Sequence, residues 1–271
     1  MRSIKNIIFM GTPQFAVPTL KLLIQNELSP KLVITKPDTK RGRGRKKSFS
    51  EVKNIAIDHN LQILQPAIIN TNSFRNILQD LKPDIIITVA YGKILGRKIL
   101  AIPRFGCINL HPSLLPQFRG PSPINRALFS GEKITGNSVY FIDSKMDSGD
   151  IILQTKINIL PEDNYGSLLQ KMSDQGANDV LKAISLIDNG TVTRIPQDHL
   201  KASYTKLLDN DICRIDWEKS ALEICNLIRG LAPYPAAFSE LGSNCVTACF
   251  TLPNLGYMRI KSSKPWKPAD Q

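Results

Sequence analysis

Short apolar runs alternate with amphipathic stretches over the first 110 residues. Five runs rich in β-branched or aromatic residues each fit one short buried strand, and they span residues 6–10, 31–35, 61–65, 84–90 and 106–110. Helical patterns cover Gln14–Asn26, after the first run, and Ser73–Leu81, before the fourth. Strands that alternate with helices form parallel sheets covered on both faces, so we predict an α/β fold with a Rossmann-like parallel sheet.

The pattern changes in the second half of the chain. Apolar runs at Ser138–Ile142 and Ile151–Ile159 predict a pair of strands, which the turn residues Met146–Asp150 connect. A long amphipathic helix is predicted at Tyr165–Ile187. Residues 191–205 are polar and have little periodicity, so we predict that they form a linker.

The region after the predicted linker is short and its apolar pattern is weak. It carries a helical pattern at Lys219–Gly230 and strand-like runs at residues 246–250 and 257–260. So few apolar positions predict a small or incomplete second domain. The expected regions are a main α/β domain at residues 1–190, a linker at 191–205 and a C-terminal domain at 206–271.

Composition narrows the class of protein. Hydrophobic residues make up 42% of the chain and charged residues 21%, which is typical of a soluble globular protein. No apolar run reaches membrane-spanning length and the first one is too short for a signal sequence, so we expect a cytoplasmic protein that does not enter a membrane. The formal net charge of +12 indicates an anionic partner, such as nucleic acid, or an anionic substrate.

The five cysteines and three histidines show no metal-binding pattern. The cysteines lack Cys-x-x-Cys spacing, and the histidines do not combine with them into a ligand set. We therefore expect no disulfide and no metal.

Asn109 and His111 are candidates for chemistry. They lie two positions apart at the end of the fifth predicted strand, so both side chains project from the same face. In open α/β sheets ligands bind beyond the carboxyl ends of the strands. Asp147, in the turn between the last two strands, is the third candidate, because a carboxylate at that sheet end orients an imidazole.

Two glycine-containing segments follow the first two strands. The first, GTPQF at residues 11–15, lacks the G-x-G-x-x-G pattern, so no dinucleotide fingerprint and no P-loop is present. The second, residues 36–48, concentrates lysine and arginine around two glycines. Its cations can contact phosphates, and we expect a salt-sensitive affinity for nucleic acid.

Six motifs carry a resemblance to a known family. In chain order they are GTPxFAVPxL at residues 11–20, KPDxxxGRGRK at 36–46, VAYGKIL at 89–95, NLHPSLLPxFRGPSPINRAL at 109–128, MDSGDI at 146–151 and RIDW at 214–217. Together they resemble the methionyl-tRNA formyltransferases, among the formyltetrahydrofolate-dependent formyltransferases. The resemblance covers about residues 4 to 235.

This resemblance implies an activity in translation initiation and protein biosynthesis. The expected reaction transfers a formyl group from 10-formyltetrahydrofolate to the α-amino group of methionyl initiator tRNA, with no metal. Asn109, His111 and Asp147 are the implied catalytic set: the first two donate to the formyl oxygen, and Asp147 accepts the amine proton. We expect the protein to be a monomer.

The resemblance also implies two binding sets and a C-terminal β-barrel that helps to hold tRNA. The implied folate pocket comprises Val89, Ala90, Tyr91, Gly92, Ile94, Leu95, Ser113, Leu114, Leu115 and Pro116. The residues implied to contact tRNA or its methionyl group are Gly11, Thr12, Pro13, Phe15, Arg41, Gly42, Arg43, Gly44, Arg45 and Lys46. Family members usually run further than this chain, so we expect a short, incomplete β-barrel-type C-terminal domain.

Three other interpretations stay open at this point. A nucleotide-sugar N-formyltransferase shares the Asn-x-His and Asp-Ser-Gly-Asp elements and fits a shorter C-terminus, but leaves the basic segment unexplained. A non-catalytic RNA-binding protein explains the basic segment, but has no need of all three catalytic candidates. A formyl-folate hydrolase shares those candidates and has no use for the basic segment.

Overall fold

The computed structural model describes residues 4–41, 46–209, 211–241, 244–249 and 259–262. Its first part contains β1 (Ile7–Gly11), the 3-10 helix η1 (Gln14–Ala16), α1 (Val17–Gln25), β2 (Leu32–Ile34), β3 (Thr39–Arg41), β4 (Lys46–Ser48), α2 (Glu51–Asp58), β5 (Ile63–Leu64), α3 (Asn72–Leu81), β6 (Ile85–Val89), α4 (Arg97–Leu100) and β7 (Cys107–His111). The second part contains α5 (Pro123–Phe129), β8 (Ile134–Phe141), β9 (Ile151–Asn158), α6 (Tyr165–Asp188), η2 (His199–Lys201), η3 (Asp211–Cys213), α7 (Ala221–Leu231), β10 (Ala237–Leu241), β11 (Asn244–Cys249) and β12 (Arg259–Ser262).

Seven strands form the central sheet, in the order β5-β2-β1-β6-β7-β8-β9. The first five run parallel, whereas β8 pairs antiparallel with both β7 and β9. This confirms the predicted α/β class, with the correction that the sheet is mixed rather than parallel throughout. A short connection explains why β9 runs antiparallel to β8, since a parallel pair needs a long crossover. The connection from β7 to β8 contains α5 and is long enough for either direction, so its length does not explain the reversal of β8.

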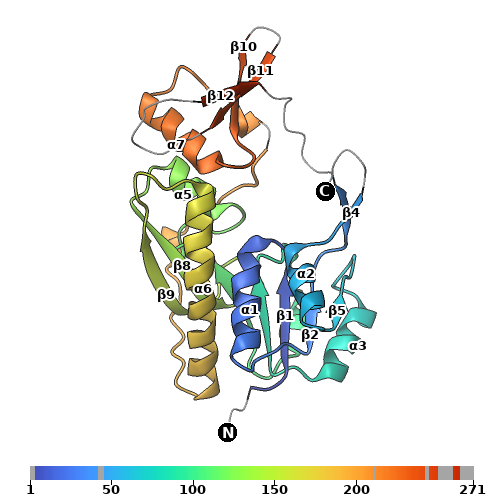
Figure 1. The fold of residues 1–271 in the computed structure, drawn as a ribbon. Coiled ribbons are helices and arrows are strands. Elements are labelled where there is room, and N and C mark those ends of the chain that lie inside the picture. Colours follow the sequence, from blue (N-terminus) through green and yellow to red (C-terminus); the bar gives the residue numbers. More distant parts are fainter. Residues whose placement is uncertain (1–3, 42–45, 210, 242–243, 250–258, 263–271) are drawn as a thin grey trace.

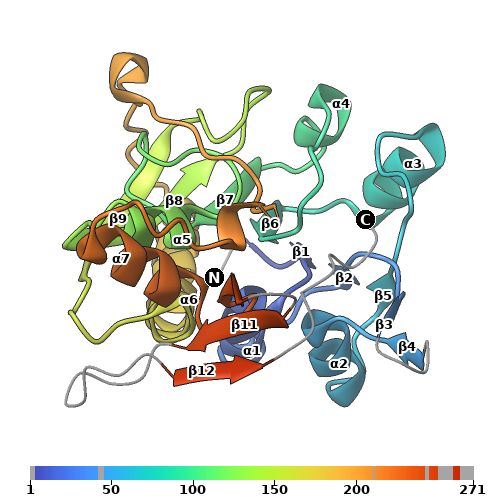
Figure 2. The same cartoon turned by 90° about the horizontal axis from the view of Figure 1, so that it is seen from above.

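Helices cover both faces of the sheet. Figure 2 shows α1, α2 and α6 on one side and α3 and α4 on the other. A hydrophobic core lies between the sheet and the helices on each side. Along β1, Ile7 and Phe9 point into the core on the side of α1, and Ile8 and Met10 point into the core on the side of α3. Burial on both sides explains why the strands read as continuous apolar runs. Within the residues that the structure describes, no helix combines the length and the apolar character needed to cross a membrane.

The segment predicted as a linker lies against the main domain. Ile195 forms two backbone hydrogen bonds with Ile151, of 2.8 and 2.9 Å, and so extends the sheet edge. Further along, the Arg119 N–H donates to the Ser203 carbonyl and the Arg119 carbonyl accepts from the Thr205 N–H, each at 2.8 Å. These contacts bring residues 195–205 to the end of the sheet where the catalytic candidates lie. The domain boundaries at 190 and 205 stay a prediction.

The C-terminal region packs on α5 through α7 (Figure 1). Asn125 Nδ2 donates to the Gly230 carbonyl at 2.7 Å across this contact. A small core surrounds Cys213 and Leu231, and β10, β11 and β12 form an antiparallel sheet beyond it. Strands predicted at residues 246–250 and 257–260 overlap β11 and β12, although residues 250–258 lie outside the described part of the chain.

Candidate active site

Asn109 lies at the centre of a row of polar side chains across three strands. The register pairs it with Thr88 on β6 and with Tyr140 on β8. Thr88 Oγ1 donates to Asn109 Oδ1 at 2.5 Å, and Asn109 Nδ2 donates to Tyr140 Oη at 3.2 Å. These bonds fix the orientation of the amide and leave one of its two N–H groups for a ligand.

Asp147 joins this row from the connection between β8 and β9. Tyr140 Oη donates to Asp147 Oδ1 at 2.6 Å, and the Gly120 N–H donates to Oδ2 at 2.6 Å. Burial raises the pKa of Tyr140 well above its usual value, and the Asp147 carboxylate raises it further. The tyrosine therefore stays protonated and remains a donor to Asp147.

His111 is buried, with only 5% of its surface exposed, at the end of β7. Its Nε2 lies 2.9 Å from the Phe118 carbonyl, and a carbonyl only accepts, so Nε2 carries a proton. The Nδ1 atom faces Asp147 Oδ2 at 3.7 Å. Nδ1 is thus the nitrogen with which His111 can exchange a proton. The structure brings the three predicted catalytic side chains to one place.

The predicted folate segment after β6 divides into buried and exposed positions. Ala90 and Gly92 have φ angles of +48° and +75°, so the backbone bends back at the carboxyl end of the sheet. Tyr91 and Leu95 are 3% and 5% exposed and pack in the core beneath, where burial raises the pKa of Tyr91 to about 12. Ile94, at 70% exposed, is open to a ligand. Val89 is fully buried as the last residue of β6.

The predicted folate segment at residues 113–116 is held by its own hydrogen bonds. Ser138 Oγ donates to the Ser113 carbonyl at 2.6 Å and accepts from the Leu115 N–H at 3.0 Å. Ser113 and Leu115 are buried, so they support the segment. Leu114 and Pro116 are half-buried and are the positions left to contact a ligand.

The residues predicted to contact tRNA do not form one group. Phe15 is 4% exposed and packs in the main core, whereas Pro13 is exposed. A Cβ at Gly11 would lie 2.9 Å from that of Ala16, so close packing requires glycine there. Thr12 Oγ1 accepts from the Lys36 N–H at 3.4 Å.

The basic segment forms a hairpin in which β3 and β4 pair antiparallel. Arg41 and Lys46 are backbone partners in this hairpin, and their side chains are not described. Gly42, Arg43, Gly44 and Arg45 lie outside the described residues altogether.

Sequence reasoning missed Thr88, Tyr140, Arg119 and Gln197. Tyr140 and Thr88 reach Asn109 only through the strand register, and in the sequence both read as ordinary positions in apolar strands. Gln197 lies in the segment predicted as a linker, yet it is 6% exposed and bonds to the Asp147 turn. A buried glutamine in a polar, aperiodic segment gives no local signal.

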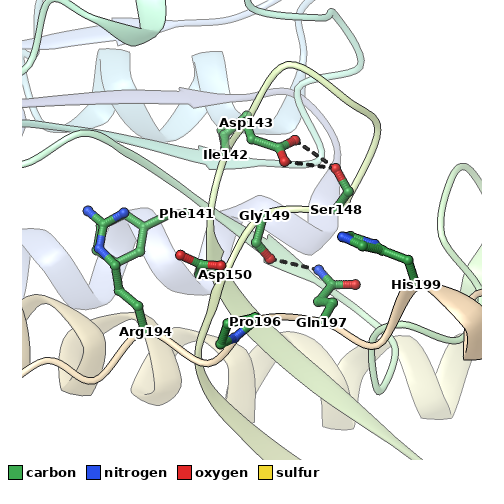
Figure 3. A pocket seen from close by; sticks show the side chains of 10 residues that line it. All are labelled: Phe141, Ile142, Asp143, Ser148, Gly149, Asp150, Arg194, Pro196, Gln197 and His199. Carbon is green, nitrogen blue, oxygen red and sulfur yellow. Dashed lines mark hydrogen bonds between the residues drawn. The ribbon is translucent and has the colours of Figure 1, made fainter.

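A pocket of about 210 Å³ opens beside the Asp147 turn, between residues 141–150 and 194–199. Figure 3 shows two of its lining residues, Gln197 and Gly149, joined by a hydrogen bond. The Arg194 guanidinium stacks on the Phe141 ring at 3.9 Å. Its lining mixes acids and bases, so one sign of charge does not dominate this pocket.

The chain is similar in sequence to known protein families over most of its length. The sequence matches the family Formyl transferase over residues 5–184 and the family Formyl transferase, C-terminal domain over residues 208–253. A methionyl-tRNA formyltransferase of Acetivibrio thermocellus is 42% identical over 233 residues, which is 86% of this chain and 75% of that protein.

Two solved structures share the fold. A 4-N formyltransferase from Francisella tularensis has a TM-score of 0.73 and 21% identity, and the match covers 92% of this chain and 99% of that one. HypX from Aquifex aeolicus in complex with tetrahydrofolic acid has a TM-score of 0.67 and 16% identity, covering 92% of this chain and 38% of that one.

Proposed function

This chain belongs to the methionyl-tRNA formyltransferase family, and on that premise we propose how its site performs the reaction. Its activity is the formylation of methionyl-tRNA. The proposed donor is 10-formyltetrahydrofolate, and the proposed acceptor is the α-amino group of methionine on initiator tRNA. The observation that carries the proposal is the row of hydrogen bonds from Thr88 through Asn109 and Tyr140 to Asp147, with His111 beside it.

The nucleotide-sugar interpretation loses its support. The sugar enzymes share the fold at 12% to 22% identity, and so does a methionyl-tRNA formyltransferase from Clostridium thermocellum at 18%, so the fold does not separate the two classes. The support for the tRNA enzyme comes from the similarity in sequence, which is 42% to 44% with two methionyl-tRNA formyltransferases. The interpretation as a non-catalytic RNA-binding protein is disfavoured too, because a binding protein has no need of an aligned amide, imidazole and carboxylate.

Two segments fit the folate donor, one on each side of Asn109. The bend at Ala90 and Gly92 and the exposed Ile94 lie at the end of β6, while Leu114 and Pro116 follow β7. Apolar side chains flanking one fixed amide donor are typical of a site for a flat, partly polar ligand. When bound there, 10-formyltetrahydrofolate supplies the activated formyl group.

The catalytic side chains divide the reaction between them. Asn109 donates its free N–H to the formyl oxygen as the amine attacks, since that oxygen gains negative charge. Asp147 accepts the proton that the attacking amine loses. The resemblance implies His111 as a second donor to the formyl oxygen. Because its Nε2 bonds to the Phe118 carbonyl and its Nδ1 faces Asp147, we propose instead that Nδ1 takes up that proton and returns it to the folate nitrogen whose bond to the formyl carbon breaks. The proton count balances without a metal or a covalent enzyme intermediate.

The tRNA contact is assigned to the basic hairpin. The net charge of +12 and the lysines and arginines between residues 36 and 48 support binding to the phosphates of the acceptor stem. Replacing one lysine or arginine that contacts a phosphate by a neutral residue is expected to reduce the slope of log K for tRNA binding against log salt concentration by about one unit.

A direct assay tests the proposal. The purified chain is given 10-formyltetrahydrofolate with methionyl initiator tRNA or with an amino-sugar nucleotide, and formyl transfer to each acceptor is measured. We expect transfer to the tRNA alone, and its loss in Asn109→Ala. Transfer to the sugar nucleotide, or transfer to the tRNA that survives Asn109→Ala, contradicts the proposal.

A further inference from the structure

Arg119 is a fully buried cation, with 2% of its surface exposed. Among the described residues no carboxylate lies within 4 Å of its guanidinium. Its Nε and Nη2 donate to Gln197 Oε1 at 3.1 and 2.6 Å, and Nη1 donates to Tyr204 Oη at 3.2 Å. Nη2 also donates to His199 Nδ1 at 3.0 Å, because an arginine has no acceptor. Buried charges are usually paired with an opposite charge. Within the described ranges Arg119 has only neutral partners, so we expect that it serves to hold neighbouring segments in a fixed position.

Gln197 joins Arg119 to the Asp147 turn. While its Oε1 accepts from the guanidinium, its Nε2 donates to the carbonyls of Asp147 and Gly149 at 3.0 and 2.8 Å. Figure 3 shows the bond to Gly149. All the hydrogen-bonding capacity of this amide is thus divided between two segments of the active site.

These two segments, residues 118–120 and 147–149, position His111 and Asp147. On one side of Arg119, the Phe118 carbonyl accepts from His111 Nε2, and on the other the Gly120 N–H donates to Asp147 Oδ2. Residues 118–120 therefore contact both members of the pair through their backbone. Ser203 supports this segment, because its Oγ accepts from the Phe118 N–H at 2.8 Å.

Asp147 has a φ of +49°, in the left-handed region that residues other than glycine rarely adopt. Such a conformation persists only where the surroundings enforce it. The bond from Gln197 Nε2 to the Asp147 carbonyl is one of the contacts that enforce it.

We propose that Gln197 and Arg119 form a clamp that positions His111 Nδ1 and Asp147 Oδ2 for proton exchange. Both are positioning residues, since they act through the backbones of residues 118–120 and 147–149. This inference rests on the proposed function of His111 and Asp147.

Gln197→Glu removes one set of the contacts that Gln197 makes and keeps the other. A carboxylate still accepts from Arg119, so the buried cation keeps a partner, but it has no N–H for the Asp147 and Gly149 carbonyls. We expect kcat for tRNA formylation to fall roughly 10- to 100-fold, which is the effect of misplacing a catalytic group by about 1 Å. KM for the folate and for tRNA should stay within about 3-fold, because the hydrogen bonds of Gln197 within the described part of the chain go to Arg119, Asp147 and Gly149, which belong to neither predicted binding set. Gln79→Glu, an exposed change on α3, is the matched control and should keep wild-type kcat.

Ser203→Ala is a milder variant for the case in which Gln197→Glu does not fold. Ser203 is exposed, so its loss leaves the core intact while removing one support of Phe118. Its kcat should fall by about 3-fold. A Gln197→Glu protein that folds with kcat within 2-fold of wild type overturns the clamp, and so does an unchanged kcat in Ser203→Ala if Gln197→Glu is unfolded.

A spectroscopic readout separates positioning from bulk structure. The ¹⁵N resonances of His111 report the protonation of each ring nitrogen, and we expect them to move in Gln197→Glu while those of His59 do not. Unchanged His111 resonances contradict the clamp. If the wild-type chain itself forms no formylmethionyl-tRNA, the proposed function fails, whereas an active wild type with an unaffected Gln197→Glu removes the clamp alone.

Discussion

The segments that follow β6 and β7 leave the same edge of the sheet side by side, yet they are built differently. After β6 the chain bends through Ala90 and Gly92, and exposed Ile94 lies next to buried Leu95. After β7 polar side chains interlock, and His111 is bonded to backbone seven positions away. The first segment offers a surface and the second offers fixed proton donors and acceptors. Binding and chemistry are therefore separable by mutation at adjacent strand ends.

Asp147→Asn is the largest expected break on the catalytic side. It preserves the shape of the side chain and the contact with Tyr140, at the loss of the bond from the Gly120 N–H, which would face the amide N–H. The amide cannot take a proton, so kcat should fall by about 100- to 10,000-fold. Steady-state formylation of methionyl-tRNA measures the effect. Asp150→Asn, in the same turn, is the control and should stay within a few-fold of wild type. A similar loss in both variants assigns the effect to the turn and not to Asp147.

Asn109→Ala comes next, because it removes the donor to the formyl oxygen and leaves catalysis of proton transfer in place. Loss of one such donor costs on the order of 100- to 1000-fold in kcat. Rates with saturating folate and tRNA check this, and circular dichroism confirms folding. A rise in KM at constant kcat contradicts the assigned role.

Tyr140→Phe tests the link between Asn109 and Asp147. Removing a hydrogen bond to a carboxylate is expected to lower kcat by about 10-fold, with KM unchanged. Burial raises the pKa of Tyr140 well above 10, so the hydroxyl stays protonated as pH rises and its ionisation adds no alkaline limb to the rate. Rate profiles from pH 7 to 10 should therefore share their shape in both proteins. An alkaline limb that only the wild type shows contradicts this.

Ile94→Ala has the smallest expected effect on the kinetics, and it tests whether the segment after β6 binds the folate donor. The side chain is 70% exposed, so the fold loses little, while a ligand loses apolar contact. We expect KM for the folate donor to rise roughly 3- to 10-fold at unchanged kcat. Ile77→Ala, an exposed isoleucine on α3, provides the control. A fall in kcat in Ile94→Ala would contradict the assignment of binding to the segment after β6 and of chemistry to the segment after β7.

The sequence predicts those parts of the molecule whose signals are local. The apolar runs locate β1, β2, β6 and β7, because strands buried on both faces need apolar residues throughout. The two-residue spacing of Asn109 and His111 likewise places both on one face. These inferences need no knowledge of distant neighbours.

Non-local contacts explain what the sequence does not predict. Tyr140 becomes part of the site only because β8 runs antiparallel to β7 in one particular register. Gln197 contacts Asp147 across 50 positions and Arg119 across 78, so polarity and lack of periodicity predict only a linker there. A side chain that acts through long-range hydrogen bonds leaves no periodic trace.

The backbone contacts of Ser203 and Thr205 with Arg119 bear on how the protein matures during synthesis. A growing chain can assemble β1 to β9 once α6 has left the ribosome, since domains fold as units while translation continues. Residues 118–120 gain their outer partners only after residue 205 has emerged. A chain released near residue 190 would therefore lack the partners that Ser203 and Thr205 supply to Phe118 and Arg119 beside the catalytic residues.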